Sequence, residues 1–288
     1  MTRSPLISAE ALLSRYAEPS PPLVIDCRHR LDAPEAGAAD YQAGHIPGAV
    51  HANLEHHLSG PKSATSGRHP LPDRAEAAHQ LGGLGIGPGI QVVAYDDMGG
   101  AMAARLWWML QWLGHEQIQV LDGGLRAWLE AGGTLEQGRV QPTPRDLPIR
   151  SAHVDVCDQE EIRQRLLTHD AEGFRLIDVR TAERFRGHSE PLDPVAGHVP
   201  GARNLPHALA LDADARFRQP HELRALFNGQ LLDEAAEQVV VMCGSGVSAC
   251  HTILAMRHAG IQGPRLYPGS WSEWIRDPDN PVATGEAD

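Results

Sequence analysis

The chain carries one set of short motifs twice, in the same order, in its two halves. Ile-Asp-x-Arg occurs at residues 25–28 and again at 177–180, and Gly-His-x-Pro-Gly-Ala occurs at 44–49 and again at 197–202. Two further pairs share an apolar run or spaced glycines and tryptophans, at 92–96 with 239–243 and at 121–128 with 267–274. Four matches in one order are hard to obtain by chance, so the two halves are predicted to share one fold.

Each half alternates short apolar runs with helix-like segments, for example at 101–113 and 248–259. This alternation is typical of an α/β domain, in which a mainly parallel β-sheet is flanked by helices. A chain of 288 residues is long enough for two such domains. Prolines in the stretch 141–148 prevent it from continuing a helix or a central strand. The predicted domains are therefore residues 1–140 and 151–288, joined by a linker at 141–150.

The second half has a cysteine where a buried strand is expected to end. Cys243 follows the apolar run 239–242 and precedes a loop with glycines at 244 and 246, after which a helix is expected. Backbone N–H groups at a helix N-terminus favour negative charge, so we expect a thiolate that acts as a nucleophile. A merely packed cysteine is the alternative. The glycines favour a reactive cysteine over a packed one, because they permit positive φ and close backbone approach, which packing does not require.

At the position of Cys243 the first half has Asp96, so the expected nucleophile is present once. Ligands of parallel α/β sheets bind at the carboxyl ends of the strands, which is where Cys243 is expected. We therefore predict that the first half is a structural partner. It is expected to shape one wall of a single active site at the domain interface.

The net charge of −12 argues against binding to nucleic acids or anionic membranes, because their phosphate groups would be repelled. An anionic substrate would need local arginines. The four cysteines have no CxxC spacing, which speaks against a zinc site or a disulfide framework. The sequence shows neither a signal-peptide pattern nor a membrane-spanning run, so we predict a cytoplasmic protein.

The ordered motifs, the single cysteine loop and the closing Gly-Ser-Trp-x-Glu-Trp at 269–274 resemble the two-domain rhodanese sulfurtransferases over nearly the whole chain. The loop 243–249 (Cys-Gly-Ser-Gly-Val-Ser-Ala) is similar to that of 3-mercaptopyruvate sulfurtransferases, whereas thiosulfate sulfurtransferases carry arginine and lysine there. An uncharged loop suits a monoanionic ketone better than a compact dianion.

The resemblance implies a ping-pong mechanism with no metal and no organic cofactor. Cys243 would take a sulfur from a small anionic donor and hold it as a persulfide. The acceptor would be cyanide or a thiol such as thioredoxin or glutathione. The loop residues expected to cradle the persulfide are Gly244, Gly246, Val247 and Ser248.

The resemblance also places Arg184 where the family keeps an arginine that binds the anionic group of the sulfur donor. A second family arginine usually follows a Glu-Pro, but here Glu190-Pro191 is followed by Leu192 and Asp193. Arg186 is the expected substitute, and thiosulfate stays open as the alternative donor. The Asp-x-Arg at 178–180 is expected to be structural, because the half without a nucleophile has it too.

Ser245 is expected to donate a hydrogen bond to the substrate carbonyl or to help move a proton as pyruvate leaves. The family suggests an acid and a histidine from the first half beside this serine, and Glu55 and His69 stand at their positions. The clustered histidines at 51, 56 and 57 are expected to be solvated, since they lack a recognised ligand spacing. Cys250 is expected to pack on the inner face of its helix.

Three other functions compete with this interpretation. A thiosulfate:cyanide sulfurtransferase would use the same cysteine. Cysteine-dependent phosphatases need Cys-x5-Arg to grip phosphate, and the sixth residue after Cys243 is Ala249. A non-catalytic rhodanese-like scaffold commonly loses the cysteine or the loop glycines, both of which this chain keeps in its second half.

Overall fold

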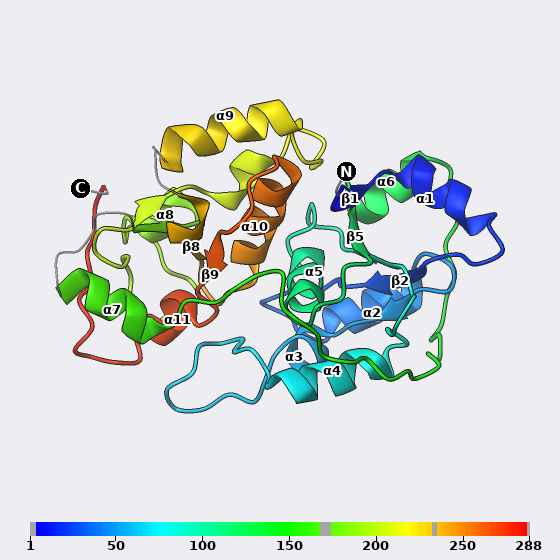
Figure 1. Ribbon diagram of the computed structural model, residues 1–288, viewed down its shortest axis with the longest axis horizontal. Helices are drawn as coiled ribbons and strands as arrows, with labels where there is room; N and C mark the ends of the chain where they lie inside the picture. Colours follow the sequence, from blue (N-terminus) through cyan, green and yellow to red (C-terminus); the bar gives the residue numbers. More distant parts are fainter. Residues whose placement is uncertain (1–3, 168–173, 232–234, 287–288) are drawn as a thin grey trace. The chain divides into compact units, whose positions relative to one another are not determined.

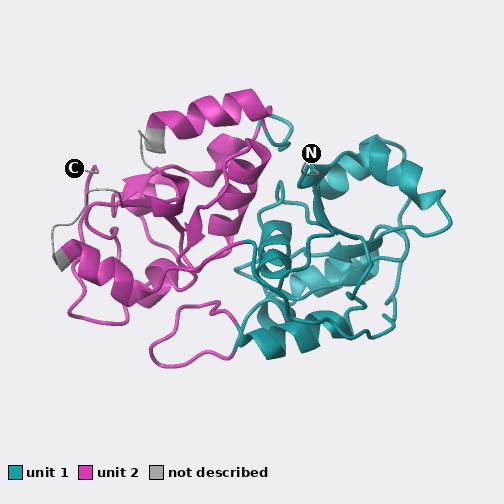
Figure 2. Cartoon of the chain, viewed as in Figure 1, with its two compact units in different colours: residues 1–60, 72–153, 212–217 teal, residues 61–71, 154–211, 218–288 magenta. Residues whose placement is uncertain are grey.

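A computed structural model describes residues 4–167, 174–231 and 235–286 (Figure 1). The chain divides into two compact units. Unit 1 contains Met1–Gly60, Pro72–His153 and Asp212–Phe217, and unit 2 contains Pro61–Leu71, Val154–Leu211 and Arg218–Asp288 (Figure 2). Each half of the chain thus contributes one short segment to the unit formed by the other half. Nothing local in the sequence marks these exchanged segments, and we had not predicted them.

Unit 1 is built on a five-stranded parallel sheet with the order β1-β5-β4-β2-β3. Its strands are β1 (Leu6–Ile7), β2 (Leu23–Asp26), β3 (Val50–His51), β4 (Val92–Tyr95) and β5 (Ile118–Leu121). The middle strands β4 and β5 are buried at every position. Strands that are buried at every position are covered on both faces of their sheet.

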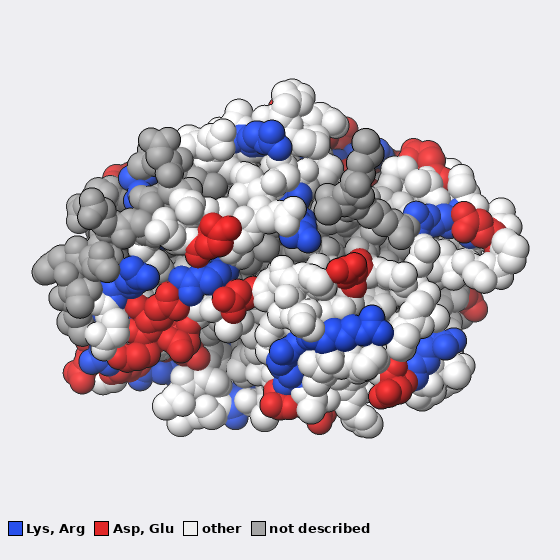
Figure 3. Space-filling view, in the orientation of Figure 1, with Lys and Arg blue, Asp and Glu red and all other residues white. Residues whose placement is uncertain are grey.

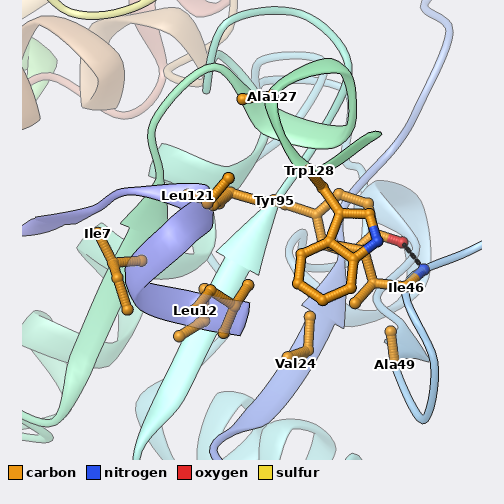
Figure 4. Packing of buried hydrophobic residues seen from close by; sticks show 11 residues of the cluster. Ile7, Leu12, Val24, Ile46, Ala49, Tyr95, Leu121, Ala127 and Trp128 are labelled. Carbon is orange, nitrogen blue, oxygen red and sulfur yellow. Dashed lines mark hydrogen bonds between the residues drawn. The ribbon is translucent and has the colours of Figure 1, made fainter. Parts of the chain in front are cut away.

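Six helices accompany this sheet among the described residues of unit 1: α1 (Ala9–Tyr16), α2 (Ala36–Ala43), α3 (Leu54–His57), α4 (Arg74–Gly83), α5 (Ala103–Trp112) and α6 (Gly124–Glu130). The Ser8 side chain caps α1 by accepting the N–H of Ala11 at 3.2 Å. Leu12 and Trp128 pack with sheet residues in the core, where the N–H of Ile46 donates to the Tyr95 hydroxyl at 3.2 Å (Figure 4).

Unit 2 repeats the design with a four-stranded parallel sheet of order β7-β6-β8-β9. Its strands are β6 (Arg175–Asp178), β7 (Arg203–Asn204), β8 (Val239–Met242) and β9 (Arg265–Leu266). The helices are α7 (Gln159–Leu167), α8 (Ala182–Phe185), η1 (His207–Ala210), α9 (Pro220–Leu231), η2 (Ala236–Gln238), α10 (Ser248–His258) and α11 (Ser270–Trp274). The predicted α/β architecture with parallel sheets is confirmed.

The repeated motifs make the same contacts in both units. The Arg28 guanidinium binds the Asp26 carboxylate and the carbonyl of residue 44, at 2.7 Å each. Arg180 binds Asp178 at 2.6 Å and the carbonyl of residue 197 at 2.7 Å. Both carboxylates are fully buried, so each pair is a desolvated ion pair that ties a central strand to the following loop. This geometry fits a structural role for the motif.

The predicted linker at 141–150 runs along unit 1, where the N–H of Arg145 donates to the carbonyl of Gly82 at 2.9 Å. No helix in the described part of the chain is long and apolar enough to cross a lipid bilayer. On the face drawn in Figure 3, Lys and Arg side chains lie among Asp and Glu side chains.

Candidate functional site

Cys243 follows the last residue of β8 and is 2% exposed. Its backbone N–H donates to the Ser270 hydroxyl at 3.1 Å, and its carbonyl accepts the N–H of Trp271 at 3.0 Å. Ser270 has a positive φ of 55°, a strained conformation for a residue other than glycine. The start of α11 therefore holds the base of the cysteine loop, and it does so through a constrained backbone.

The two loop glycines serve different purposes. Gly246 has a φ of 74°, and a Cβ built on it would lie 2.3 Å from the carbonyl oxygen of Pro268. Gly244 does not have positive φ, so of the two properties that we expected of the glycines it uses only the close approach of neighbouring groups. A Cβ on Gly244 would instead lie 2.8 Å from Nη2 of Arg68. Gly246 allows the turn into α10, and Gly244 allows guanidinium groups to approach the loop.

The corresponding loop of unit 1, which follows β4, holds a carboxylate. The Asp96 carboxylate occupies the position of the cysteine and accepts four backbone N–H groups at 2.7–2.8 Å, from residues 98, 100, 102 and 103. Burial raises the pKa of the Asp96 carboxyl, and these four N–H groups oppose the rise. A strand–loop–helix junction of this kind concentrates backbone N–H groups on one negative group.

Two arginines flank Gly244. Nη2 and Nη1 of Arg184, at 3.4 and 3.5 Å, lie near the same hypothetical Cβ that Arg68 approaches. Both guanidinium groups pair with the buried carboxylate of Asp193, Arg68 at one oxygen and Arg184 at the other, the latter at 3.3 Å. Arg184 also binds Glu190 at 2.7 Å. The expected position of Arg184 beside the loop is therefore matched by a second arginine that we had not predicted.

The ion pairs continue into the motif shared by both units. Glu190 also binds Arg180 at 3.2 Å, and Arg180 binds Asp178. Burial lowers the pKa of Arg180, but Asp178 and Glu190 outweigh it and raise that pKa overall. The Arg180 guanidinium lies 4.7 Å above the Trp271 ring. Three arginines and three carboxylates thus alternate in one network whose formal charges cancel.

Ser245, two residues after the cysteine, is 4% exposed and shares a hydrogen bond of 2.8 Å with Nδ1 of His69. His69 is 3% exposed and belongs to the 61–71 segment of unit 2. A buried serine paired with an imidazole can transfer a proton, because either group can donate or accept. The structure thus brings two of the predicted site residues together.

Arg186 and Glu55 each make a contact of their own. Arg186 pairs with Glu286 at 2.7 Å, and Arg68 takes the place beside the loop that we expected for Arg186. Glu55 lies in unit 1, in the first turn of α3, where its N–H donates to the Asn53 side chain at 2.8 Å. Its predicted acid role stays a prediction. Val247 and Ser248 lead into α10 as expected, Val247 being 4% exposed.

His56 is exposed, as we expected for the three clustered histidines, but His51 and His57 are less solvated than expected. Nδ1 of His57 accepts the N–H of Asn53 at 2.9 Å, and Nε2 of His51 is 3.3 Å from the carbonyl of Arg28. Both rings are partly buried, and this burial lowers both pKa values, that of His57 to about 4. Cys250 is fully buried in α10, with Sγ 3.2 Å from the carbonyl of residue 246, in line with packing.

Sequence reasoning missed Arg68, Ser270 and Ser272. The Ser272 hydroxyl accepts the N–H of Arg68 at 3.0 Å, and its own N–H donates to the carbonyl of Gly244 at 2.9 Å. Arg68 directly precedes His69, so the only local signal was its adjacency to a residue already suspected. The two serines lie within the closing motif at 269–274, which was recognised by its glycine and tryptophans and not by its serines.

Comparison with known proteins matches a family described as the rhodanese-like domain to residues 8–131 and again to 158–277. A probable 3-mercaptopyruvate sulfurtransferase of Pseudomonas aeruginosa is 45% identical, over 99% of this chain and 100% of that protein. A putative thiosulfate sulfurtransferase, SseB of Mycobacterium tuberculosis, is 42% identical over 98% of both chains. The solved structure of SseA from Escherichia coli, a 3-mercaptopyruvate sulfotransferase, superposes with a TM-score of 0.79 at 30% identity, over 94% of this chain and 100% of that one.

Proposed function

Because the chain belongs to the rhodanese-like family and carries two copies of its domain, we propose that it is a sulfurtransferase that uses a persulfide on Cys243. The sulfur donor is 3-mercaptopyruvate, and the acceptor is a thiol or cyanide. One observation carries the proposal: Cys243 lies in the loop between β8 and α10, with two guanidinium groups beside Gly244 and the Ser245–His69 pair two residues after the cysteine. The active loop is that of unit 2, since Asp96 fills the corresponding loop of unit 1.

The first half-reaction balances without an added oxidant or reductant. The Cys243 thiolate attacks the sulfur of mercaptopyruvate, a new S–S bond forms, and the C–S bond breaks with its electron pair leaving on carbon. The leaving group is the enolate of pyruvate, which takes up the proton that the donor thiol releases. The Ser245–His69 pair is positioned to carry that proton to the carbon, and the arginines hold the carboxylate.

The persulfide is an anion at the position that a carboxylate occupies in unit 1. The four N–H groups on Asp96 support a cradle of the same kind around a persulfide on Cys243. By the matching order of the two loops, Ser245, Val247 and Ala249 correspond to residues 98, 100 and 102, and we infer that backbone N–H groups of this loop hold the persulfide. The two loops are not identical, because α10 begins five residues after Cys243 whereas α5 begins seven residues after Asp96. Such preorganised donors stabilise the charged intermediate without reorganisation of water.

Thiosulfate is the second candidate donor, favoured by the name of the mycobacterial relative. Its reaction with the thiolate gives the same persulfide and releases sulfite, a leaving group that needs no proton on carbon. The Ser245–His69 pair has no step to perform in that reaction. A built proton relay beside the loop therefore supports mercaptopyruvate over thiosulfate.

In the second half-reaction an acceptor attacks the outer sulfur and regenerates the Cys243 thiolate. The chemistry admits cyanide or a thiol, such as glutathione or the dithiol of a thioredoxin. All four cysteines are free thiols, which supports a reducing, cytoplasmic setting.

The test compares 3-mercaptopyruvate and thiosulfate under identical conditions, with Cys243→Ser as the matched control. Intact mass records one added sulfur on the protein, and turnover with cyanide as acceptor gives kcat and KM for each donor. We expect loading by mercaptopyruvate, none in the serine variant, and a clearly higher kcat/KM for mercaptopyruvate.

A higher kcat/KM for thiosulfate would overturn the choice of donor and leave the sulfurtransferase intact. If neither donor loads the wild-type protein, or if Cys243→Ser stays active, the sulfurtransferase proposal is wrong. The first of these results would favour a non-catalytic scaffold.

A further inference from the structure

The chain lacks an arginine after Glu190-Pro191, yet a second guanidinium group reaches the cysteine loop. It belongs to Arg68, which lies 125 residues before its partner Asp193 in the sequence and enters unit 2 with the 61–71 segment. Asp193 is the second residue after Pro191, in the same short stretch where the arginine is missing. The missing charge is thus supplied from another part of the chain.

The backbone on both sides of Arg68 is held in place. A Cβ on Gly67 would lie 2.6 Å from the carbonyl oxygen of Gly269, so the segment runs in direct contact with the start of α11. The Arg68 N–H donates to the Ser272 hydroxyl at 3.0 Å, and the next residue, His69, is bonded to Ser245. Arg68 is therefore positioned by the same elements that position the nucleophile.

In each of the two arginines, some guanidinium nitrogens bind carboxylates and another lies close to the cysteine loop. Arg68 uses Nη1 for Asp193 and places Nη2 nearest to Gly244. Arg184 uses Nε and Nη2 for Glu190 and Asp193, and its Nη1 lies 3.5 Å from the hypothetical Cβ of Gly244. The Arg68 side chain keeps 22% exposure and that of Arg184 keeps 17%, whereas that of Asp193 keeps only 3%. Both cations are reachable from solvent, and the carboxylate that joins them is covered.

We propose that Arg68 and Arg184 form a two-guanidinium clamp for the anionic group of the sulfur donor, and that Asp193 sets both its geometry and its net charge. The proposal rests on the sulfurtransferase function proposed above and identifies what determines its choice of donor. Arg68 and Arg184 would contact the donor, and Asp193 acts through them as a positioning residue.

The charge balance indicates which donor the clamp prefers. Three arginines and three carboxylates cancel in the network, so the clamp offers directed N–H groups but little net positive charge. A planar monoanionic carboxylate matches the fork geometry of guanidinium. A dianion gains less from a neutral network, because its binding depends more on net charge. Asp193 therefore favours mercaptopyruvate over thiosulfate.

The experiment measures kcat and KM for both donors in wild type, Arg68→Gln, Arg68→Lys and Asp193→Asn. Arg163→Gln is the matched control, because Arg163 also lies in unit 2 and pairs with a carboxylate, that of Asp277 at 3.0 Å. We expect Arg68→Gln to raise the KM for mercaptopyruvate by roughly 10- to 100-fold, as the loss of a charged hydrogen bond does, with kcat within a few-fold. Arg68→Lys should recover part of this loss, since it keeps the charge without the fork.

Asp193→Asn is expected to shift the ratio of kcat/KM for thiosulfate over mercaptopyruvate upward by roughly 10-fold, because one negative charge is removed next to the site. If the KM for mercaptopyruvate in Arg68→Gln equals that in Arg163→Gln, the two-guanidinium clamp is wrong. If Asp193→Asn leaves the ratio of kcat/KM for the two donors unchanged, the proposed effect of Asp193 on the net charge of the clamp is wrong. Thermal unfolding of each variant shows whether it folds. If Arg68→Gln does not fold, the KM of Arg68→Lys for mercaptopyruvate tests the clamp in its place. A wild-type protein that takes sulfur from neither donor would instead mark failure of the proposed function.

Discussion

The Ser245 hydroxyl lies 2.8 Å from Nδ1 of His69, although 176 residues separate the two in the sequence. Both side chains are buried, so water does not compete strongly for either partner. Mercaptopyruvate needs a proton delivered to carbon as its C–S bond breaks, and thiosulfate does not. This pair therefore separates the two donors in a way that a single substitution can reveal.

Ser245→Ala is expected to lower kcat for mercaptopyruvate by about 100-fold or more, which is the usual contribution of a positioned proton-transfer group. Transfer from thiosulfate should change by only a few-fold. Steady-state kinetics with both donors check this, with sulfur loading by intact mass as a second measure. An equal loss with both donors would show that the serine acts on the loop rather than on the proton.

Alanine substitutions at the two loop glycines should have different consequences. Gly246→Ala places a side chain at positive φ and against the Pro268 carbonyl, so the free energy of unfolding should fall by more than about 2 kcal/mol. Gly244→Ala meets only the ends of arginine side chains, so stability should stay within about 1 kcal/mol while KM for the sulfur donor rises. Urea denaturation and kinetics check both. Equal losses of stability would contradict the different roles assigned to Gly246 in the turn and to Gly244 beside the guanidinium groups.

The Asp96 carboxylate in the unit 1 loop should contribute more to the free energy of unfolding than an ordinary surface carboxylate does. Asp96→Asn replaces an acceptor of four N–H groups with an amide whose NH₂ faces some of them, so unfolding should become easier by about 2 to 3 kcal/mol. Asp97→Asn is the control, because it removes the same charge from the next residue and breaks only the partly exposed pair with Arg30, for about 1 kcal/mol or less. Denaturant midpoints compare the two, and equal effects would refute the cradle.

His57 should make stability fall in mild acid. Burial, followed by the charges of His51 and His56, lowers its pKa from 6.5 to about 4 in the folded protein. The unfolded chain therefore binds the proton first, so the contribution of His57 is fully present above pH 6.5 and is lost as the pH falls toward 4. Between pH 7 and 4.5 this amounts to roughly 2 kcal/mol.

The matched variants for this effect are His57→Gln and His56→Gln, the second at an exposed neighbour. Wild type minus His57→Gln should show the acid loss in urea titrations at several pH values, whereas wild type minus His56→Gln should stay nearly flat. A flat difference for His57 would contradict the assignment.

The fold class could be predicted because it depends on local patterns that occur twice. Apolar four-residue runs before glycine-rich turns indicate parallel strands, and the Asp-x-Arg motif forms the same buried ion pair in each unit. Cys243 could be singled out for the same reason, since a strand, a glycine turn and a helix start lie within a few residues. The comparisons confirm both the fold and the family.

Arg68 illustrates what local patterns do not contain. Its role depends on contacts with Asp193, Gly244 and Ser272, none of which is near it in the sequence. Arg186 was preferred in its place because it lies close to Arg184 along the chain. Residues two apart on one short helix turn point in different directions, so proximity in sequence did not imply a shared target.

The sequence by itself determined the two α/β units, the family and the placement of one cysteine in a loop between a strand and a helix, because each follows from backbone preferences and apolar spacing over a few residues. Only the tertiary structure decided which arginine stands beside Arg184 and that His69 meets Ser245. Those contacts arise when the 61–71 segment packs into unit 2, where burial and charge pairing between distant residues select the partners.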